Sequence, residues 1–334
     1  MRIVVTGATG NIGTSVLKSL AGEPGVERVI GIGRRLPSES IAKAEFAARD
    51  VAKDELLDVF AGADAVVHLA WLLQPRREEA RLESVNVGGS ARVFDAVVRA
   101  GVPQLVVASS VGAYSPGPKD RRVEESWPTC GIASSLYSRQ KAKVERALDR
   151  LEGAHPELRV ARLRPALVFK REASSEIRRL FLGRLLPLSV LRIPALRLVP
   201  NMPRFRFQAV HSLDVGEAFR SAVVRRAHGA YNIAAEPVLD ARQIADALGA
   251  KSVRVPRLVF RGAAAAGYHL RLQPTDPGWV DLALQVPLMS TERAARELGW
   301  SARRTSTEAL AELVHGIARS AGAPTAPLEP EGSR

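Results

Sequence analysis

The sequence of 334 residues predicts an α/β protein built on a doubly wound parallel sheet. In the first half, short apolar runs alternate with amphipathic helical patterns, which is typical of strands joined by crossover helices. These apolar runs show no polar alternation, which indicates strands buried on both faces. A glycine-rich turn, "TGATGNIG" at 6–13, lies directly between the first strand and the first helix.

Each strand predicted in the first half is a short apolar run, and the first, "RIVVT", begins at residue 2. Helical periodicity predicts the crossovers between the strands. In chain order we expect strands at 2–6, 28–32, 44–48, 65–70, 104–109 and 158–163, with helices at about 11–21, 53–60, 77–100 and 133–152.

The sequence pattern changes after Arg164, where the alternation of predicted strands and helices becomes less regular. One more strand precedes a helix that starts near Ser212. We then expect short strands at 230–234 and 252–256, a helix around 240–248, and a helix at 290–300 that Ser290 caps and Gly299 closes.

The glycine turn has the spacing G-x-x-G-x-x-G, with Gly7, Gly10 and Gly13. Such glycines allow a tight turn, a close approach of the backbone to a pyrophosphate, and close packing of helix on strand. The helix start at Asn11 and Ile12 offers N–H groups and a positive dipole end to phosphate. The turn therefore predicts a dinucleotide site in a Rossmann-type domain.

The end of the second strand, "VIGIGRR", bears on the choice of cofactor. NAD-binding sheets place an acidic residue there to bind the adenine ribose 2′-hydroxyl, but this chain has Gly33 followed by Arg34 and Arg35. Two guanidiniums favour a 2′-phosphate, so we expect NADP, with NAD as the alternative. After the third strand, Asp50 and Val51 are expected to contact the adenine.

Tyr137 and Lys141 in "LYSRQK" lie four residues apart, so a helix places them on one face. One interpretation is simple packing of a ring and a lysine stem. The other is that the ammonium lowers the pKa of the phenol, so that Tyr137 exchanges a proton near neutral pH.

Five segments occur together in an order that resembles the extended short-chain dehydrogenase/reductase family. They are "TGATGNIG" at 6–13, "HLA" at 68–70, "NVGGSARVFDAV" at 86–97, "SSVGAY" at 109–114 and "YSRQK" at 137–141. The resemblance covers roughly the first 170 residues well and continues more loosely through "RPALVF" and "VHSLDVGEAF". It implies a Rossmann-type fold and NAD(P)-dependent chemistry of the epimerase/dehydratase kind.

The resemblance implies a role for each matching residue. Tyr137 would be the general acid/base, Lys141 would lower its pKa and bind the nicotinamide ribose, and Ser110 would hold the substrate oxygen. Substrate contacts are expected from Trp71, Leu72 and Tyr114. The residues expected to bind the cofactor are Gly7, Gly10, Asn11, Ile12, Gly13, Arg34, Arg35, Asp50, Val51, Leu69, Ala70, Asn86, Ser109, Tyr137, Lys141 and Pro165.

The segment after the fourth strand departs from the sugar-nucleotide enzymes, because Trp71, Leu72 and Leu73 replace small and polar residues. An apolar wall favours an oxidoreductase that interconverts a secondary alcohol and a ketone by hydride transfer. A sugar epimerase or dehydratase with transient hydride transfer is the alternative. A non-catalytic dinucleotide-sensing protein is a third, although such proteins commonly lose the tyrosine–lysine pair.

The chain is expected to have two parts and a tail. Residues 1–164 would form the Rossmann-type dinucleotide-binding domain, to which 206–234 return. Residues 165–205 and 235–320 would form a smaller C-terminal substrate domain, with a flap over the pocket within 180–200. Residues 321–334, rich in Pro, Gly and Ala, are expected to be a disordered tail.

Composition narrows the class of protein further. The formal net charge is +13, but the basic residues are spread along the chain, so we expect an anionic small molecule rather than nucleic acid as the partner. A single cysteine, Cys130, fits a cytoplasmic protein, and six histidines show no metal-ligand spacing. No stretch has the length of a membrane span. A homodimer is expected by analogy with the family.

Overall fold

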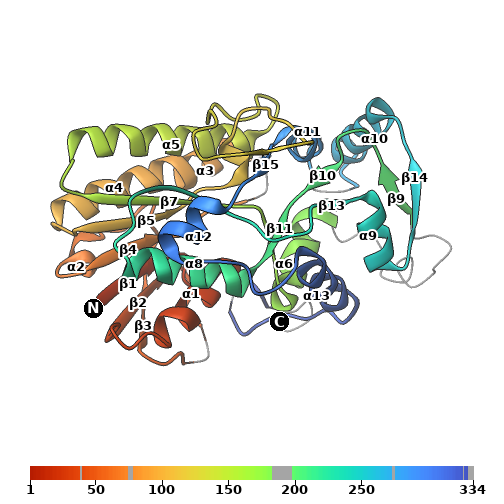
Figure 1. Cartoon of the computed structure of the whole chain (residues 1–334). Coiled ribbons are helices and arrows are strands. Elements are labelled where there is room, and N and C mark those ends of the chain that lie inside the picture. The colour runs from red at the N-terminus through yellow and green to blue at the C-terminus, as the bar shows by residue number, and fades with distance from the viewer. Residues whose placement is uncertain (38–39, 74–77, 183–197, 273–274, 326, 330–334) are drawn as a thin grey trace.

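The computed structural model describes residues 1–37, 40–73, 78–182, 198–272, 275–325 and 327–329. Its centre is a seven-stranded sheet with the order β12-β7-β5-β4-β1-β2-β3, in which every pair of neighbours is parallel (Figure 1). The strands are β1 (Arg2–Thr6), β2 (Arg28–Gly33), β3 (Ala44–Ala48), β4 (Ala65–His68), β5 (Gln104–Ala108), β7 (Arg159–Pro165) and β12 (Gly229–Ile233).

The strand order shows that the sheet is doubly wound. From β1 the chain first adds β2 and β3 on one side and then crosses to add β4, β5, β7 and β12 on the other. In open α/β sheets of this kind, ligands bind beyond the carboxyl ends of the strands, where the winding reverses. The predicted fold class is therefore confirmed, and it places a ligand crevice between the ends of β1 and β4.

Helices pack on both faces of the sheet and form two cores. On one face, α1 (Asn11–Ala21) and α8 (Ser212–Val224) contribute Leu17 and Phe219 to an apolar cluster. On the other, α2 (Leu57–Phe60), α4 (Gly89–Arg99) and α5 (Leu136–Ala154) contribute Phe60, Phe94 and Leu148. Burial on both faces explains why the strands read as unbroken apolar runs.

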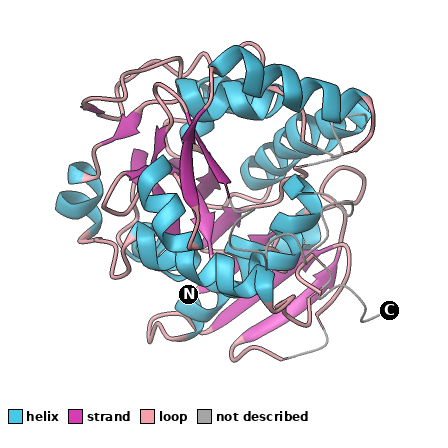
Figure 2. Cartoon of the chain, turned by 90° about the vertical axis from the view of Figure 1, so that its right-hand side faces the viewer, coloured by secondary structure: helices cyan, strands magenta, loops and turns pink. Residues whose placement is uncertain are grey.

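The second half adds four small two-stranded pairings and a group of helices beside the sheet (Figures 1 and 2). The pairs are β6 (Arg122–Val123) with β15 (Leu288–Met289), β8 (Leu167–Phe169) with β11 (Ala209–His211), β9 (Leu198–Asn201) with β14 (Lys251–Arg254), and β10 (Arg206–Phe207) with β13 (Leu239–Asp240). The longer helices there are α9 (Ala241–Leu248), α10 (Arg257–His269), α11 (Gly278–Gln285), α12 (Glu292–Leu298) and α13 (Ser306–Ala318).

Two expected helices differ in detail. The helix expected at 53–60 is shortened to α2. The one expected at 77–100 is divided into α3 (Glu79–Glu83), a π-helical turn at Ser84–Gly88, and α4. Such π turns are frequent at functional sites. None of the helices among the described residues has the length and hydropathy needed to cross a membrane.

Part of the expected tail lies among the described residues. Within residues 321–325 and 327–329, Leu328 is buried and Arg179 donates to the carbonyl oxygens of Pro327 and Glu329. A composition rich in Pro and Ala does not reveal these contacts. Most of the expected flap, 183–197, lies outside the described residues.

Candidate active site

The turn between β1 and α1 is shaped for a close approach of backbone to ligand. Gly7 has φ +69°, and a Cβ there would lie 2.7 Å from the Ala70 nitrogen. A Cβ on Gly13 would overlap the Gly7 carbonyl, so helix and turn are in direct contact. A Cβ on Gly10 meets only the Gly7 oxygen at 3.5 Å, so the protein itself leaves room there.

The N-terminus of α1 fits an anionic group. Gly10 is its N-cap and provides no side-chain hydrogen bond, and no acidic residue lies in the first turn. The Asn11 side chain donates to the Val168 carbonyl at 3.1 Å, but its own Oδ1 is buried and has no hydrogen-bond partner among the described residues. The Lys170 ammonium donates to the Asn11 carbonyl at 2.7 Å. These features suit a pyrophosphate, which the N–H groups and the positive dipole end would bind.

The residues expected around the adenosine lie at the neighbouring strand ends. Arg34 and Arg35 are exposed after β2, and Gly33 lies beside the Thr9 side chain. After β3, the Asp50 carboxylate accepts from the Ala52 backbone at 3.0 Å, and Val51 is buried against Gly89. Asp50 therefore shapes its own turn.

Ser109 and Ser110 follow β5, and their side chains have different surroundings. The Ser110 hydroxyl accepts from the Gly112 backbone at 3.0 Å and hydrogen-bonds Tyr137. The Ser109 hydroxyl donates to the buried Glu145 carboxylate. Ser110 thus closes its loop and contacts the tyrosine at the same time.

Tyr137 and Lys141 lie on α5, above the end of β5. Burial raises the pKa of Tyr137 to about 12, and its hydrogen bond with Ser110 opposes this. Burial lowers the pKa of Lys141 to about 7, and the Glu145 carboxylate opposes this. The expected lowering of the tyrosine pKa by the lysine is therefore absent in the protein alone. The reason is geometric, because the ammonium donates to the Ala108 carbonyl at 2.7 Å and lies 6.0 Å from the tyrosine ring centroid.

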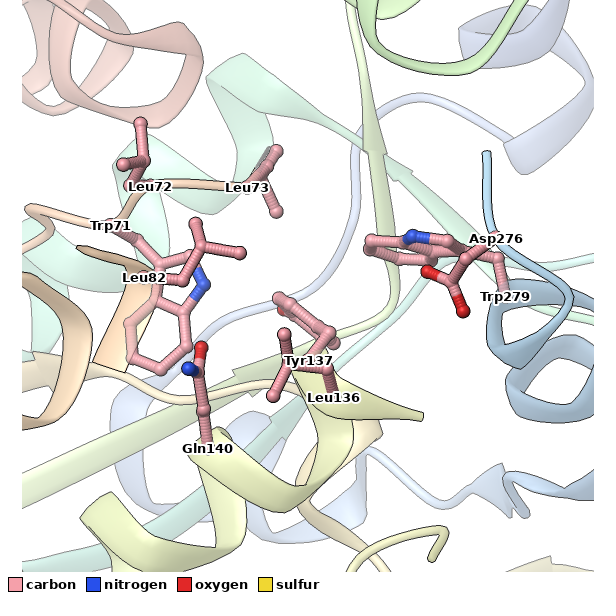
Figure 3. A pocket seen from close by; sticks show the side chains of 9 residues that line it. All are labelled: Trp71, Leu72, Leu73, Leu82, Leu136, Tyr137, Gln140, Asp276 and Trp279. Atoms are coloured by element: carbon pink, nitrogen blue, oxygen red, sulfur yellow. The ribbon is translucent and has the colours of Figure 1, made fainter. Parts of the chain in front are cut away.

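Two tryptophans flank Tyr137. The Trp71 ring meets it edge-on at a centroid distance of 5.9 Å, and Trp279 lies at 5.0 Å with an interplanar angle of 31°. The Lys141 ammonium lies 3.5 Å from the Trp71 ring centroid, and the buried indole N–H of Trp71 has no hydrogen-bond partner among the described residues. Figure 3 shows the small cavity here, lined by Trp71, Leu72, Leu73, Leu82, Leu136, Tyr137, Gln140, Asp276 and Trp279.

Asn86 holds the loop after β4 through hydrogen bonds to Leu72 and Gln140. It lies in the π-helical turn, where its side-chain oxygen accepts from the Leu72 backbone at 2.7 Å. Its amide donates to the Leu72 carbonyl and to the Gln140 side chain, both at 2.9 Å. Asn86 therefore positions Leu72 on the cavity wall, and its expected contact with the cofactor stays a prediction.

Tyr114, expected to contact substrate, is not among the cavity-lining residues. It is fully buried, and its hydroxyl donates to Asn232 at 2.7 Å and accepts from Arg164 at 2.9 Å. Arg164 also donates to Glu145 at 2.8 Å. Tyr114 thus belongs to a buried ionic network behind Ser109.

The remaining residues expected to bind the cofactor lie at the ends of strands. Leu69 and Ala70 follow β4 beside the glycine turn, and Pro165 ends β7. The sequence reasoning missed Gln140, Asp276, Trp279 and Glu145. For Gln140 and Glu145 a signal existed, since they adjoin or follow Lys141 on one helix. No three His, Cys, Asp or Glu side chains in the described part of the chain are grouped to hold a metal ion.

With this geometry in place, comparison with known proteins defines the class. The chain belongs to the NAD dependent epimerase/dehydratase family, whose model matches residues 3–234. It is an enzyme of the extended short-chain dehydrogenase/reductase type that uses a nicotinamide dinucleotide, as the motifs predict.

Particular relatives cover nearly the whole chain. UDP-glucose 4-epimerase 3 of Oryza sativa subsp. japonica is 26% identical and covers 90% of this chain and 85% of its own. The 4-hydroxy-2-methyl-3-oxo-4-farnesyl-3,4-dihydroquinoline-1-oxide ketoreductase of Stigmatella aurantiaca is 25% identical and covers 94% and 96%. A structure of UDP-glucose-4-epimerase from Stenotrophomonas maltophila with bound NAD and formylated UDP-arabinopyranose has a TM-score of 0.73 at 21% identity, covering 96% and 98%.

Proposed function

We propose that the protein is an NAD(P)-dependent epimerase or dehydratase, which oxidises a secondary alcohol of a sugar-class substrate to a ketone and returns the hydride to the same substrate within one turnover. The observation that carries this proposal is the convergence of Ser110, Tyr137 and Lys141 at the end of β5, beside a turn that fits a pyrophosphate. The family and the UDP-glucose 4-epimerase relatives support it.

In this proposal each side chain has a separate task. Tyr137 takes the proton of the substrate hydroxyl as general base and returns it later, while Ser110 donates a hydrogen bond to the same oxygen. Lys141 stabilises the phenolate by its charge, which requires its ammonium to be protonated and close to the phenol. The glycine turn and the start of α1 would hold the dinucleotide, whose nicotinamide accepts and returns the hydride when bound.

NADP is proposed as the preferred cofactor. The support is local: Gly33 provides no carboxylate for a ribose 2′-hydroxyl, and Arg34 and Arg35 are exposed beside it. Guanidiniums bind phosphate with charge-assisted, bidentate hydrogen bonds. Several structural relatives are described with NAD. A comparison of NADPH and NADH binding by this protein therefore tests the proposed preference directly.

A second candidate is a reductase that consumes reduced cofactor and converts an apolar ketone to an alcohol. The observation that favours it is the cavity wall, where Trp71, Leu72 and Trp279 offer carbon surface to the substrate. The ketoreductase of Stigmatella aurantiaca, one of the relatives, matches 94% of this chain.

The two candidate functions differ in whether reduced cofactor is consumed during turnover. With UDP-glucose and oxidised cofactor, the epimerase or dehydratase gives a new sugar nucleotide, seen by NMR, with no lasting change in the absorbance of reduced nicotinamide. The reductase instead consumes reduced cofactor in proportion to the alcohol formed from an added aromatic ketone. Tyr137→Phe should lower either activity by about 100-fold or more and leave dinucleotide affinity unchanged. Full activity in this variant would contradict both candidates.

A further inference from the structure

α10 is a surface helix whose outward face is apolar. It has 13 residues, and none of them is buried. Leu258 is 82% exposed and Leu270 is 69% exposed. Helices of soluble proteins normally turn their apolar stripe towards the core. The exposed residues of α10 after Arg257, with Leu270 at its C-cap, recur at helical spacing and carry no carboxylate, ammonium or guanidinium: Leu258, Val259, Gly262, Ala263, Ala266, His269 and Leu270.

Ion pairs with α11 fix α10 in this orientation. Arg257 and Arg261 both reach the Asp281 carboxylate, at 3.2 and 3.0 Å. The Asp281 side chain is only 4% exposed, so turning α10 over would leave a buried carboxylate without these partners. Such a loss is strongly destabilising. The apolar face is therefore held outward by the charged residues of the same helix.

The apolar area continues next to α10. Leu198 on β9, Val253 on β14 and Leu272 after α10 are all exposed, and β9 pairs with β14. Figures 1 and 2 show these elements together at one end of the molecule, beside the main sheet. Exposed apolar side chains gathered at one end of a molecule are typical of a binding site for another molecule. We call it the α10 surface: Leu198, Val253, Leu258, Val259, Leu270 and Leu272.

The segment that forms β14 and α10 carries charges of one sign. Residues 251–275 contain no aspartate or glutamate. Lys251 and Arg254 before α10 and Arg271 after it are exposed. An apolar face bordered by lysine and arginine is the pattern of a helix that lies in the plane of a membrane interface. These basic residues are attracted to anionic headgroups.

We propose that the α10 surface binds an anionic phospholipid membrane, with α10 flat at the headgroup boundary. A second copy of the chain fits less well. In a two-fold interface the same patch meets itself, so the basic residues beside one patch, Lys251, Arg254 and Arg271, would be brought close to the basic residues beside the other. A lipid surface instead offers carbon for the leucines and negative charge for the basic residues. Because α11 begins at Gly278 and carries Trp279, the docked helix is joined by Asp281 to the cavity wall.

The test is cosedimentation of the full-length protein with vesicles of equal parts phosphatidylglycerol and phosphatidylcholine, and with vesicles of phosphatidylcholine alone. We expect binding to the anionic vesicles that weakens with salt, and little binding to the neutral ones. Leu258→Asp should lower the partition constant by about tenfold or more, since burial of one leucine side chain is lost.

Leu36→Asp is the matched control, because Leu36 is 52% exposed outside the α10 surface and the substitution adds the same charge. It should leave most of the binding intact. Circular dichroism shows that each variant is folded. No binding of the unmodified protein to anionic vesicles would overturn the proposal, and so would equal losses in Leu36→Asp and Leu258→Asp. Self-association that Leu258→Asp abolishes, without vesicle binding, would assign the surface to a second copy.

Discussion

At the scale of single residues, spacing predicts proximity but not protonation. The four-residue spacing of Tyr137 and Lys141 predicts one helix face, and α5 provides it. The pKa values depend on burial and on partners from elsewhere in the chain: the Ala108 carbonyl accepts a hydrogen bond from the Lys141 ammonium, and the Trp71 ring covers that ammonium. No local pattern in the sequence contains those contacts, which is why the expected effect of Lys141 on the tyrosine was wrong for the protein alone.

The lowered pKa of Lys141 predicts a pH-dependent stability. Burial lowers its pKa from 10.5 to about 7, so between these values the unfolded chain binds more protons than the folded one. Stability from this group therefore rises with pH across that window. Lys141→Met removes the contribution. We expect the free energy of unfolding of the variant, measured with urea, to rise less from pH 7 to 10 than that of the unmodified protein. Parallel curves for the two proteins would contradict the assignment.

Cofactor choice is also decided at single residues. Arg34→Ala should weaken NADPH binding by about tenfold, the effect of losing one charge-assisted contact, and leave NADH binding unchanged. Calorimetric titration with both cofactors measures the difference. The preference for NADPH should decline as salt screens the exposed guanidiniums. Tighter binding of NADH by the unmodified protein would show that neither arginine meets a 2′-phosphate.

At the scale of elements, the strands of the sheet were the most predictable part. Strands buried on both faces give unbroken apolar runs, and β1, β2 and β5 occur close to where those runs predict them. Shorter elements were less predictable. The two-residue strands β6 and β10 exist through pairing with β15 and β13, far away in the chain, and the π-helical turn around Asn86 depends on contacts with Leu72.

The turn between β1 and α1 allows a prediction that separates packing from ligand binding. Gly13→Ala places a methyl group on the Gly7 carbonyl and should lower the free energy of unfolding by roughly 1–3 kcal/mol. Gly10→Ala finds space in the protein and should keep nearly normal stability. Its dinucleotide affinity, measured by calorimetry, should nevertheless fall, because the methyl group faces the pyrophosphate. Normal affinity in a folded Gly10→Ala protein would place the pyrophosphate elsewhere.

At the scale of the whole molecule, the cavity is assembled from three distant segments. The loop after β4 brings Trp71, α5 brings Tyr137, and the start of α11 brings Trp279. The first two belong to the part of the chain that resembles the family well, so they could be predicted. Trp279 comes from the less regular second half, and nothing local in the sequence links it to the tyrosine.

Because Trp279 lines the cavity and comes from the second half of the chain, we predict that it contacts the substrate and not the cofactor. Trp279→Ala should raise the KM for substrate and leave the dinucleotide dissociation constant unchanged, because Trp279 lines the cavity beside Tyr137. Removing the stacked ring should also let water reach the phenol and bring the pKa of Tyr137 down from about 12. The measurements are steady-state kinetics, calorimetry and a pH titration of tyrosinate absorbance. Weaker dinucleotide binding in Trp279→Ala would contradict the assignment of Trp279 to the substrate.

The two tryptophans beside Tyr137 also allow ligand binding at the site to be followed by their fluorescence. The chain has four tryptophans, and two of them, Trp71 and Trp279, lie against Tyr137. Indole emission overlaps the absorption of reduced nicotinamide, so a dinucleotide bound here quenches it by energy transfer. A ligand that separates Trp71 from the Lys141 ammonium changes the emission in a second, independent way. Occupancy by either molecule can therefore be followed by fluorescence, without a label, a known substrate or turnover.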